Sequence, residues 1–128
     1  MGPAADPRTR VPPVVDSPSR DRLLAALAAA EARGLKRFAA PVPDSVPASG
    51  AYVPPTVVTG VDPRDPLAQD ELFGPVLAVV EARDFDDALR IAMDTPYALT
   101  AGLYSRSPAR VEQARAELRV GNLYINRP

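Results

Sequence analysis

The stretch VLAVVEARDFDDALRIAMDTPYALTAGLYSRSPARVEQARAELRVGNLYIN, residues 76–126, decides the fold class. Three apolar runs predict strands, and the two amphipathic segments between them predict helices. The strands are expected at residues 76–82, 99–105 and 120–126, and the helices at residues 84–93 and 108–118. Asp84 and Ser107 are expected to cap the helices, because their side chains can accept hydrogen bonds from first-turn amides. This alternation indicates an α/β fold with βαβ units, right-handed crossovers and a parallel sheet.

One further helix is expected before this stretch. Ser17-Pro18 predicts its start, because serine is a good N-cap and proline loses no hydrogen bond at the first helical position. The helix is expected over residues 17–33 and should end at Gly34, since glycine readily adopts the left-handed conformation that follows helices. Its apolar face is expected to consist of Leu23, Leu24, Leu27 and Ala30.

Two strand candidates and a proline-rich segment complete the organisation. The strand candidates are residues 35–40 and 51–61. Pro54-Pro55 interrupts the second one and, because proline has no amide hydrogen, is expected to keep it out of a central ladder. Residues 1–15 are rich in proline and have no periodicity, so we expect a strap there and α/β elements over residues 16–128.

Composition excludes several classes of function. The 128 residues include 15 Lys and Arg and 16 Asp and Glu, a net charge of −1 that argues against a nucleic-acid-binding protein. The chain has no histidine and no cysteine, which excludes Ser-His-Asp catalysis, cysteine nucleophiles and thiolate or imidazole metal sites within it. No apolar run approaches the ~20 residues of a membrane span, and no signal peptide is recognisable. We expect a soluble, cytoplasmic chain.

The densest group of functional side chains is QDELFGP, residues 69–75. Two acids and a phenylalanine precede a Gly-Pro pair, which favours a sharp turn. A carboxylate there can accept hydrogen bonds from ligand hydroxyls, and the phenylalanine can cover a flat ring. The alternative interpretation is a turn with a solvated acid and a core phenylalanine.

A second acidic group lies at the start of the helix expected from residue 84. Asp84, Asp86 and Asp87 could bind a metal ion, but acids in a first helical turn are more simply explained by the helix dipole. No other type of metal ligand stands nearby, so no metal site is predicted.

Several motifs resemble those of NAD(P)-dependent aldehyde dehydrogenases. DELFGPVL at residues 70–77 closely resembles the family's E-[IL]-F-G-P-V motif. PPTVV at 54–58 resembles the upstream P-T-v strand, and TPYALT at 95–100 resembles the T-x-Y-G-L segment. VGNLYINR at 120–127 is similar to the form found in Δ1-pyrroline-5-carboxylate dehydrogenases, as are the Asp-Pro and Pro-Val-Val-Asp segments within residues 6–16. The resemblance covers nearly the whole chain, in order.

The resemblance implies that residues 1–128 are a partial aldehyde dehydrogenase catalytic domain, with a mostly parallel sheet and βαβ crossovers. The family's catalytic cysteine and general base would lie upstream, so this chain is expected to contribute no catalytic residue. The implied cofactor is NAD. Glu71 would accept hydrogen bonds from the nicotinamide ribose hydroxyls, Phe73 would pack near the nicotinamide, and Leu99 would line the same region.

The implied function is a segment of an enzyme that oxidises L-glutamate γ-semialdehyde to glutamate in proline catabolism. Its partners would be the remainder of the dehydrogenase chain or a partner subunit, and its substrate a small aldehyde, without nucleic acid or membrane. The chain alone is expected to be inactive. Two alternatives remain: a non-enzymatic truncated domain that binds a partner subunit, and a decayed reading frame.

The sequence departs from the family pattern at Pro12, Met93 and Ala98. Ala98 stands where the family has glycine, and it would require a different backbone if the position needs a positive φ.

Overall fold

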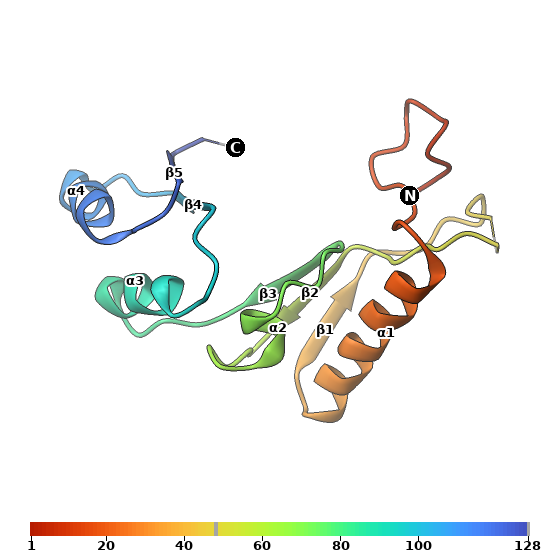
Figure 1. Ribbon diagram of the computed structural model, residues 1–128, viewed down its shortest axis with the longest axis horizontal. Helices are drawn as coiled ribbons and strands as arrows, with labels where there is room; N and C mark the ends of the chain where they lie inside the picture. Colours follow the sequence, from red (N-terminus) through yellow and green to blue (C-terminus); the bar gives the residue numbers. More distant parts are fainter. Residues whose placement is uncertain (48, 128) are drawn as a thin grey trace. The chain divides into compact units, whose positions relative to one another are not determined.

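The computed structural model describes residues 1–47 and 49–127, which form two compact units, Met1–Val80 and Glu81–Pro128. The elements are labelled in Figure 1: α1 (Ser17–Ala32), β1 (Lys36–Ala39), β2 (Thr56–Thr59), α2 (Pro66–Gln69), β3 (Val76–Val79), α3 (Phe85–Met93), β4 (Thr100–Leu103), α4 (Pro108–Glu117) and β5 (Asn122–Ile125). Within the described part of the chain, no helix has the length and apolar character needed to cross a bilayer.

The first unit is built on a three-stranded sheet with the order β1-β2-β3. β1 runs antiparallel to β2, and β2 runs parallel to β3. β2 is therefore the central strand, and the expectation that Pro54-Pro55 would keep this segment out of a central ladder is wrong. Both prolines precede β2, where their missing amide hydrogens disturb no ladder bond, and the carbonyl of Pro55 accepts a hydrogen bond from the Ala40 amide at 2.8 Å.

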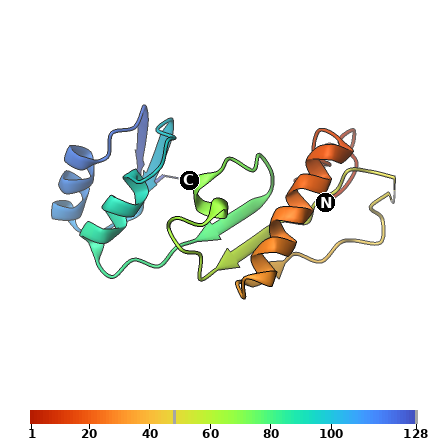
Figure 2. The ribbon, with the colours of Figure 1, turned by 60° about the horizontal axis from the view of Figure 1, so that its bottom comes forward.

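One face of this sheet carries the core of the unit, and α1 lies along the sheet in both ribbon views (Figures 1 and 2). The core consists of Leu27 and Ala30 from α1, Val58 from β2, Val61, and Leu67 from α2. The strand register places Phe38, Val57 and Leu77 together on the opposite face. Phe38 is 60% exposed and Leu77 59% exposed, so β3 is half-buried, although a continuous apolar run of this kind is typical of a fully buried strand.

The ends of α1 follow local capping rules, with one shift at the start. Asp16, not Ser17, is the N-cap, and its carboxylate accepts a hydrogen bond from the Ser19 amide at 2.8 Å. At the other end, Gly34 has a φ of 86°, as expected. Its amide donates to the carbonyl of Glu31, and the next amide donates to the carbonyl of Ala30. This pair of bonds is a Schellman motif, which ends the helix and turns the chain toward β1.

α2 is a single helical turn that the sequence interpretation missed. Asp65 is its N-cap and accepts a hydrogen bond from the Leu67 amide at 2.9 Å. The Asp65 carboxylate also pairs with the guanidinium of Arg33, the C-cap of α1, through bonds of 2.9 and 3.0 Å. The turn is therefore connected to the end of α1.

The second unit contains a βαβ motif, as predicted. β4 and β5 are parallel neighbours, and α4 connects them. Asp84 and Ser107 cap α3 and α4 as expected. β4 pairs with β5 while β3 pairs with β2, so the predicted run of alternating strands is divided between two sheets. The α/β fold class with parallel strands is confirmed.

Candidate functional site

The predicted site residues lie on two segments, one in each unit. Glu71 and Phe73 belong to the loop of residues 70–75, which connects α2 to β3. Leu99 directly precedes β4 in the second unit. Glu71 and Phe73 thus lie on one loop of the first unit, whereas Leu99 belongs to the second unit.

Phe73 has an unusual backbone and an unusual environment. Its φ is 54°, a left-handed conformation that is uncommon for a bulky residue. Its side chain is 79% exposed, which contradicts the alternative interpretation of a core phenylalanine. Backbone strain of this kind often accompanies function, because it is retained where a side chain must take a particular direction. Glu71, two positions earlier, is also exposed.

Two contacts with α1 hold this loop. Arg22 donates a hydrogen bond from Nη1 to the carbonyl oxygen of Leu72 at 2.8 Å. Gly74 approaches the buried Leu23 so closely that a Cβ on residue 74 would lie 2.5 Å from Leu23 Cδ1. Sequence reasoning missed both contacts, because they join residues about 50 positions apart and leave no periodic signal. The glycine of the motif itself was the available indication of a close approach.

A hollow of about 460 Å³ borders the loop on the side of α1 and α2. Alanine and leucine side chains form its apolar part, and charged groups stand around it. The lining residues include Arg22, Ala26, Leu67, Asp70, Glu71 and Leu72. Glu71 therefore borders a concave surface and not a flat one.

The backbone around Leu99 is held by the start of β5. The Asn122 amide donates to the Leu99 carbonyl at 3.1 Å, and the Gly121 amide donates to the Ala98 carbonyl at 2.9 Å. A Cβ on residue 121 would lie 2.9 Å from the Leu99 carbonyl oxygen, so glycine is needed for this approach. Leu99 itself is 78% exposed. Ala98 has no positive φ, so the backbone there suits alanine.

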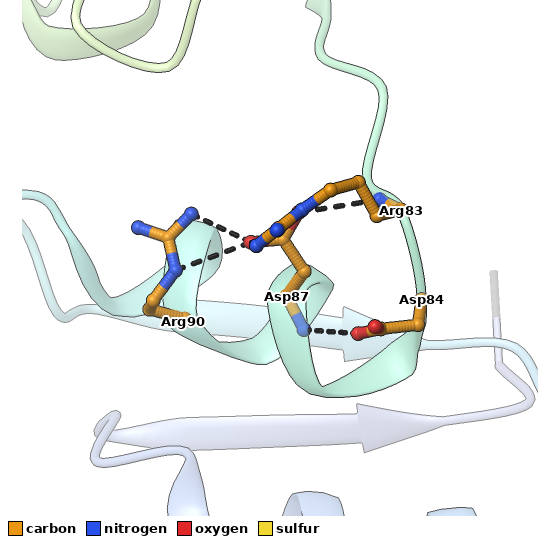
Figure 3. A network of polar contacts seen from close by, with 4 residues as sticks. All are labelled: Arg83, Asp84, Asp87 and Arg90. Atoms are coloured by element: carbon orange, nitrogen blue, oxygen red, sulfur yellow. Dashed lines mark hydrogen bonds and ion pairs between the residues drawn. The ribbon is translucent and has the colours of Figure 1, made fainter.

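The aspartates at the start of α3 form a polar network and not a metal site (Figure 3). Asp87 is only 7% exposed and accepts bonds from Arg83 at 2.9 and 3.0 Å and from Arg90 at 2.6 and 3.1 Å. These bonds, first from Arg83 and then from Arg90, hold the pKa of the Asp87 carboxyl far below its usual range. Asp84 accepts from the Asp87 amide at 2.8 Å, and Asp86 accepts from Gln113 at 2.6 Å. Within residues 1–47 and 49–127, no group of three potential ligands could hold a metal ion.

The loop therefore presents an exposed carboxylate and an exposed aromatic ring, and it contains no cysteine, serine or lysine. An exposed carboxylate can accept charge-assisted hydrogen bonds from hydroxyl groups. An adjacent exposed aromatic ring can exclude water from a bound planar group.

The chain as a whole is similar in sequence to known proteins. The model of the aldehyde dehydrogenase family matches residues 1–128. A 1-pyrroline-5-carboxylate dehydrogenase of Geobacillus sp. (strain WCH70) is 39% identical over 127 residues, covering 99% of this chain and 24% of that protein. The corresponding protein of Bacillus subtilis (strain 168) is 37% identical, with the same coverage.

Solved structures agree with this match. Proline utilization A from Bdellovibrio bacteriovorus superposes with a TM-score of 0.86 at 46% identity, covering 95% of this chain and 12% of that chain. A 1-pyrroline-5-carboxylate dehydrogenase from Thermus with bound NAD has a TM-score of 0.78 at 40% identity, covering 91% of this chain and 22% of that chain. The present chain spans about a quarter of the length of the curated relatives it matches. With its whole length matched by the family model, the chain belongs to the aldehyde dehydrogenase family.

Proposed function

We propose that this chain is the part of an NAD-dependent aldehyde dehydrogenase that contacts the nicotinamide end of the cofactor. The enzyme would oxidise L-glutamate γ-semialdehyde to glutamate, a step of proline catabolism. The observation that carries the proposal is the exposed Phe73 ring, held in a left-handed conformation beside Glu71. The substrate assignment is supported by the names of the relatives, which are 1-pyrroline-5-carboxylate dehydrogenases.

The exposed residues of this chain suit a nicotinamide ribose. The Glu71 carboxylate has two oxygens that can each accept a bond from one ribose hydroxyl. The Phe73 ring would exclude water beside the nicotinamide. The assignment of Leu99 to the cofactor rests on the motif resemblance alone. When bound, NAD⁺ supplies the hydride acceptor. The chain's contribution is to position and shield, because it contains no cysteine to attack the aldehyde.

The face of the three-stranded sheet opposite the core is suited to contact another protein segment. Phe38, Val57 and Leu77 share this face, and together with Val11 they line a shallow hollow of about 650 Å³. Clustered exposed apolar side chains typically mark an interface. We propose that the remainder of the dehydrogenase chain covers this face. A partner subunit is the alternative.

The substitution Glu71→Gln in a complete dehydrogenase that contains this segment tests the cofactor assignment. Glutamine keeps the shape and one acceptor oxygen but removes the charge, and charge-assisted bonds are each worth roughly 1.5–3 kcal/mol. We expect hydride transfer to slow by about 10-fold or more, equivalent to about 1.4 kcal/mol of barrier. The dissociation constant of NAD should change less, because most cofactor contacts are expected outside this segment. Single-turnover kinetics with stopped-flow detection of NADH measures the first quantity directly.

Asp70→Asn is the matched control, because it removes a charge from the neighbouring position of the same loop. The control should leave hydride transfer unchanged. If Glu71→Gln also leaves the rate unchanged, Glu71 is a solvated turn residue and the cofactor assignment is wrong. If both variants slow the reaction equally, the effect comes from the charge of the loop and not from a bond to the ribose.

A further inference from the structure

Arg22 makes a contact that is unlike those of two other arginines of the same segment. Arg20 of α1 pairs with the adjacent Asp21 at 2.8 Å, and Arg33, the C-cap of α1, pairs with Asp65. Arg22 instead donates to a main-chain oxygen, the carbonyl of Leu72, at 2.8 Å. A bond to a carbonyl restrains the backbone itself, whereas a bond to a carboxylate restrains a mobile side chain.

The carbonyl that Arg22 holds lies between the two candidate cofactor residues. Leu72 follows Glu71 and precedes Phe73, whose φ of 54° requires support from its surroundings. On the other side of Phe73, Gly74 packs against Leu23. Two consecutive residues of α1 thus contact the loop immediately before and immediately after its left-handed residue.

Two backbone hydrogen bonds at the end of the loop can be used to measure how well the loop is ordered. The Val76 amide donates to the Gly74 carbonyl at 2.8 Å, and the Thr56 amide donates to the Pro75 carbonyl at 2.9 Å. The second bond connects the end of the loop to the start of β2. The bond from Arg22 reaches the loop backbone at Leu72, between these two bonds and α2.

We propose that Arg22 is a positioning residue for hydride transfer: through the Leu72 carbonyl it sets the backbone that directs Glu71 and Phe73. The proposal rests on the cofactor assignment of Glu71 made above. Loss of the contact would misdirect the two side chains without removing either of them. Because hydride transfer is more sensitive to small misplacements than binding is, the rate of that step should change more than cofactor affinity.

Hydrogen exchange of the 128-residue chain tests the contact without any cofactor. Arg22→Ala should speed exchange of the Val76 amide about tenfold, because a bond from a charged donor is lost. Arg22→Lys keeps a charged donor and should lie closer to the wild-type rate. Arg20→Ala, the matched control on the same helix, should leave this amide unchanged. Equal exchange in Arg22→Ala and wild type would overturn the proposal.

Kinetics in a complete dehydrogenase that contains this segment tests the functional consequence. Arg22→Ala should slow single-turnover hydride transfer roughly tenfold, with a smaller change in NAD affinity. Combined with Glu71→Gln, the loss should be less than the product of the two single losses, because both act on the same contact. Arg22→Lys should restore most of the rate.

The outcomes separate the two proposals. If Glu71→Gln slows the reaction and Arg22→Ala does not, the positioning role is wrong and the cofactor assignment stands. If Glu71→Gln has no effect, the cofactor assignment fails and the positioning role fails with it, whereas hydrogen exchange still decides whether Arg22 orders the loop. If the effects of the two substitutions multiply, Arg22 acts by a route other than Glu71 and the proposal is overturned.

Discussion

Gly74→Ala tests how closely the FGP turn must approach α1. An ideal Cβ on residue 74 would lie 2.5 Å from Cδ1 and 2.7 Å from Cδ2 of Leu23. Carbon atoms attract one another at about 3.5–4.0 Å, so the added methyl would overlap the leucine by about 1 Å. Leu23 is 0% exposed and therefore has no solvent into which to rotate. Gly74 is not among the glycines with positive φ, so the expected penalty is steric and owes nothing to backbone strain.

The magnitude follows from two opposing effects. Overpacking a well-packed site typically costs about 1–3 kcal/mol. Replacing glycine reduces the entropy of the unfolded chain and offsets about 0.4–1 kcal/mol of that cost. We expect a net destabilisation of about 1–2 kcal/mol, measured as a lower urea midpoint by circular dichroism. Gly102→Ala is the control, because the nearest heavy atom to its Cβ would be the carbonyl oxygen of Tyr124 at 3.9 Å.

A double mutant makes this reasoning falsifiable. Leu23→Ala alone should cost about 2–5 kcal/mol, because it leaves a cavity under the loop. In that background the alanine at residue 74 has room, so the added cost of Gly74→Ala should fall close to zero. Strictly additive costs would show that the two residues do not compete for the same space.

Two further predictions concern activity and pH. The purified 128-residue chain should form no NADH from L-glutamate γ-semialdehyde and NAD⁺, because it has no cysteine; NADH production by protein from a host without its own dehydrogenase would contradict this. The folded pKa of Asp87 is depressed by Arg83 and Arg90, so its stabilising contribution is present above the unfolded pKa of about 3.9 and is lost as the pH falls below it. Wild type should therefore lose thermal stability more steeply than Asp87→Asn below about pH 5, whereas parallel pH profiles would exclude a stabilising charge.

Local signals in the sequence were sufficient for much of the fold. Asp84 and Ser107 cap α3 and α4 as expected, because capping depends on residues within one helical turn. A cap followed by proline, Asp65-Pro66, was also available for α2, but the turn-rich surroundings obscured a helix of four residues. The start of α1 shifted by one residue because Asp16 and Ser17 are both good caps.

Contacts between distant parts of the chain could not be predicted from sequence patterns. Pro54-Pro55 predicts exclusion of the whole segment from a central ladder, but a proline excludes only the ladder position that it occupies. The apolar sequence of β3 did not show that one face of its sheet is uncovered, because periodicity does not reveal what lies above a strand. The motif residues Glu71 and Phe73 were found by resemblance, but Arg22, which contacts their loop, was not. That contact depends on how α1 lies against the unit, which the helix sequence alone does not specify.

The ion pair between Arg33 and Asp65 has a consequence for how the first unit opens. A single turn such as α2 is too short to persist alone, since helix nucleation is unfavourable. Asp65 caps that turn while holding the residue that ends α1, 32 positions earlier in the chain. Fraying of the last turn of α1 would therefore remove the polar contact that holds α2, and the burial of Leu67 would be the contact that remains. The amides at the end of α1 and in α2 should therefore exchange faster together when this ion pair is removed.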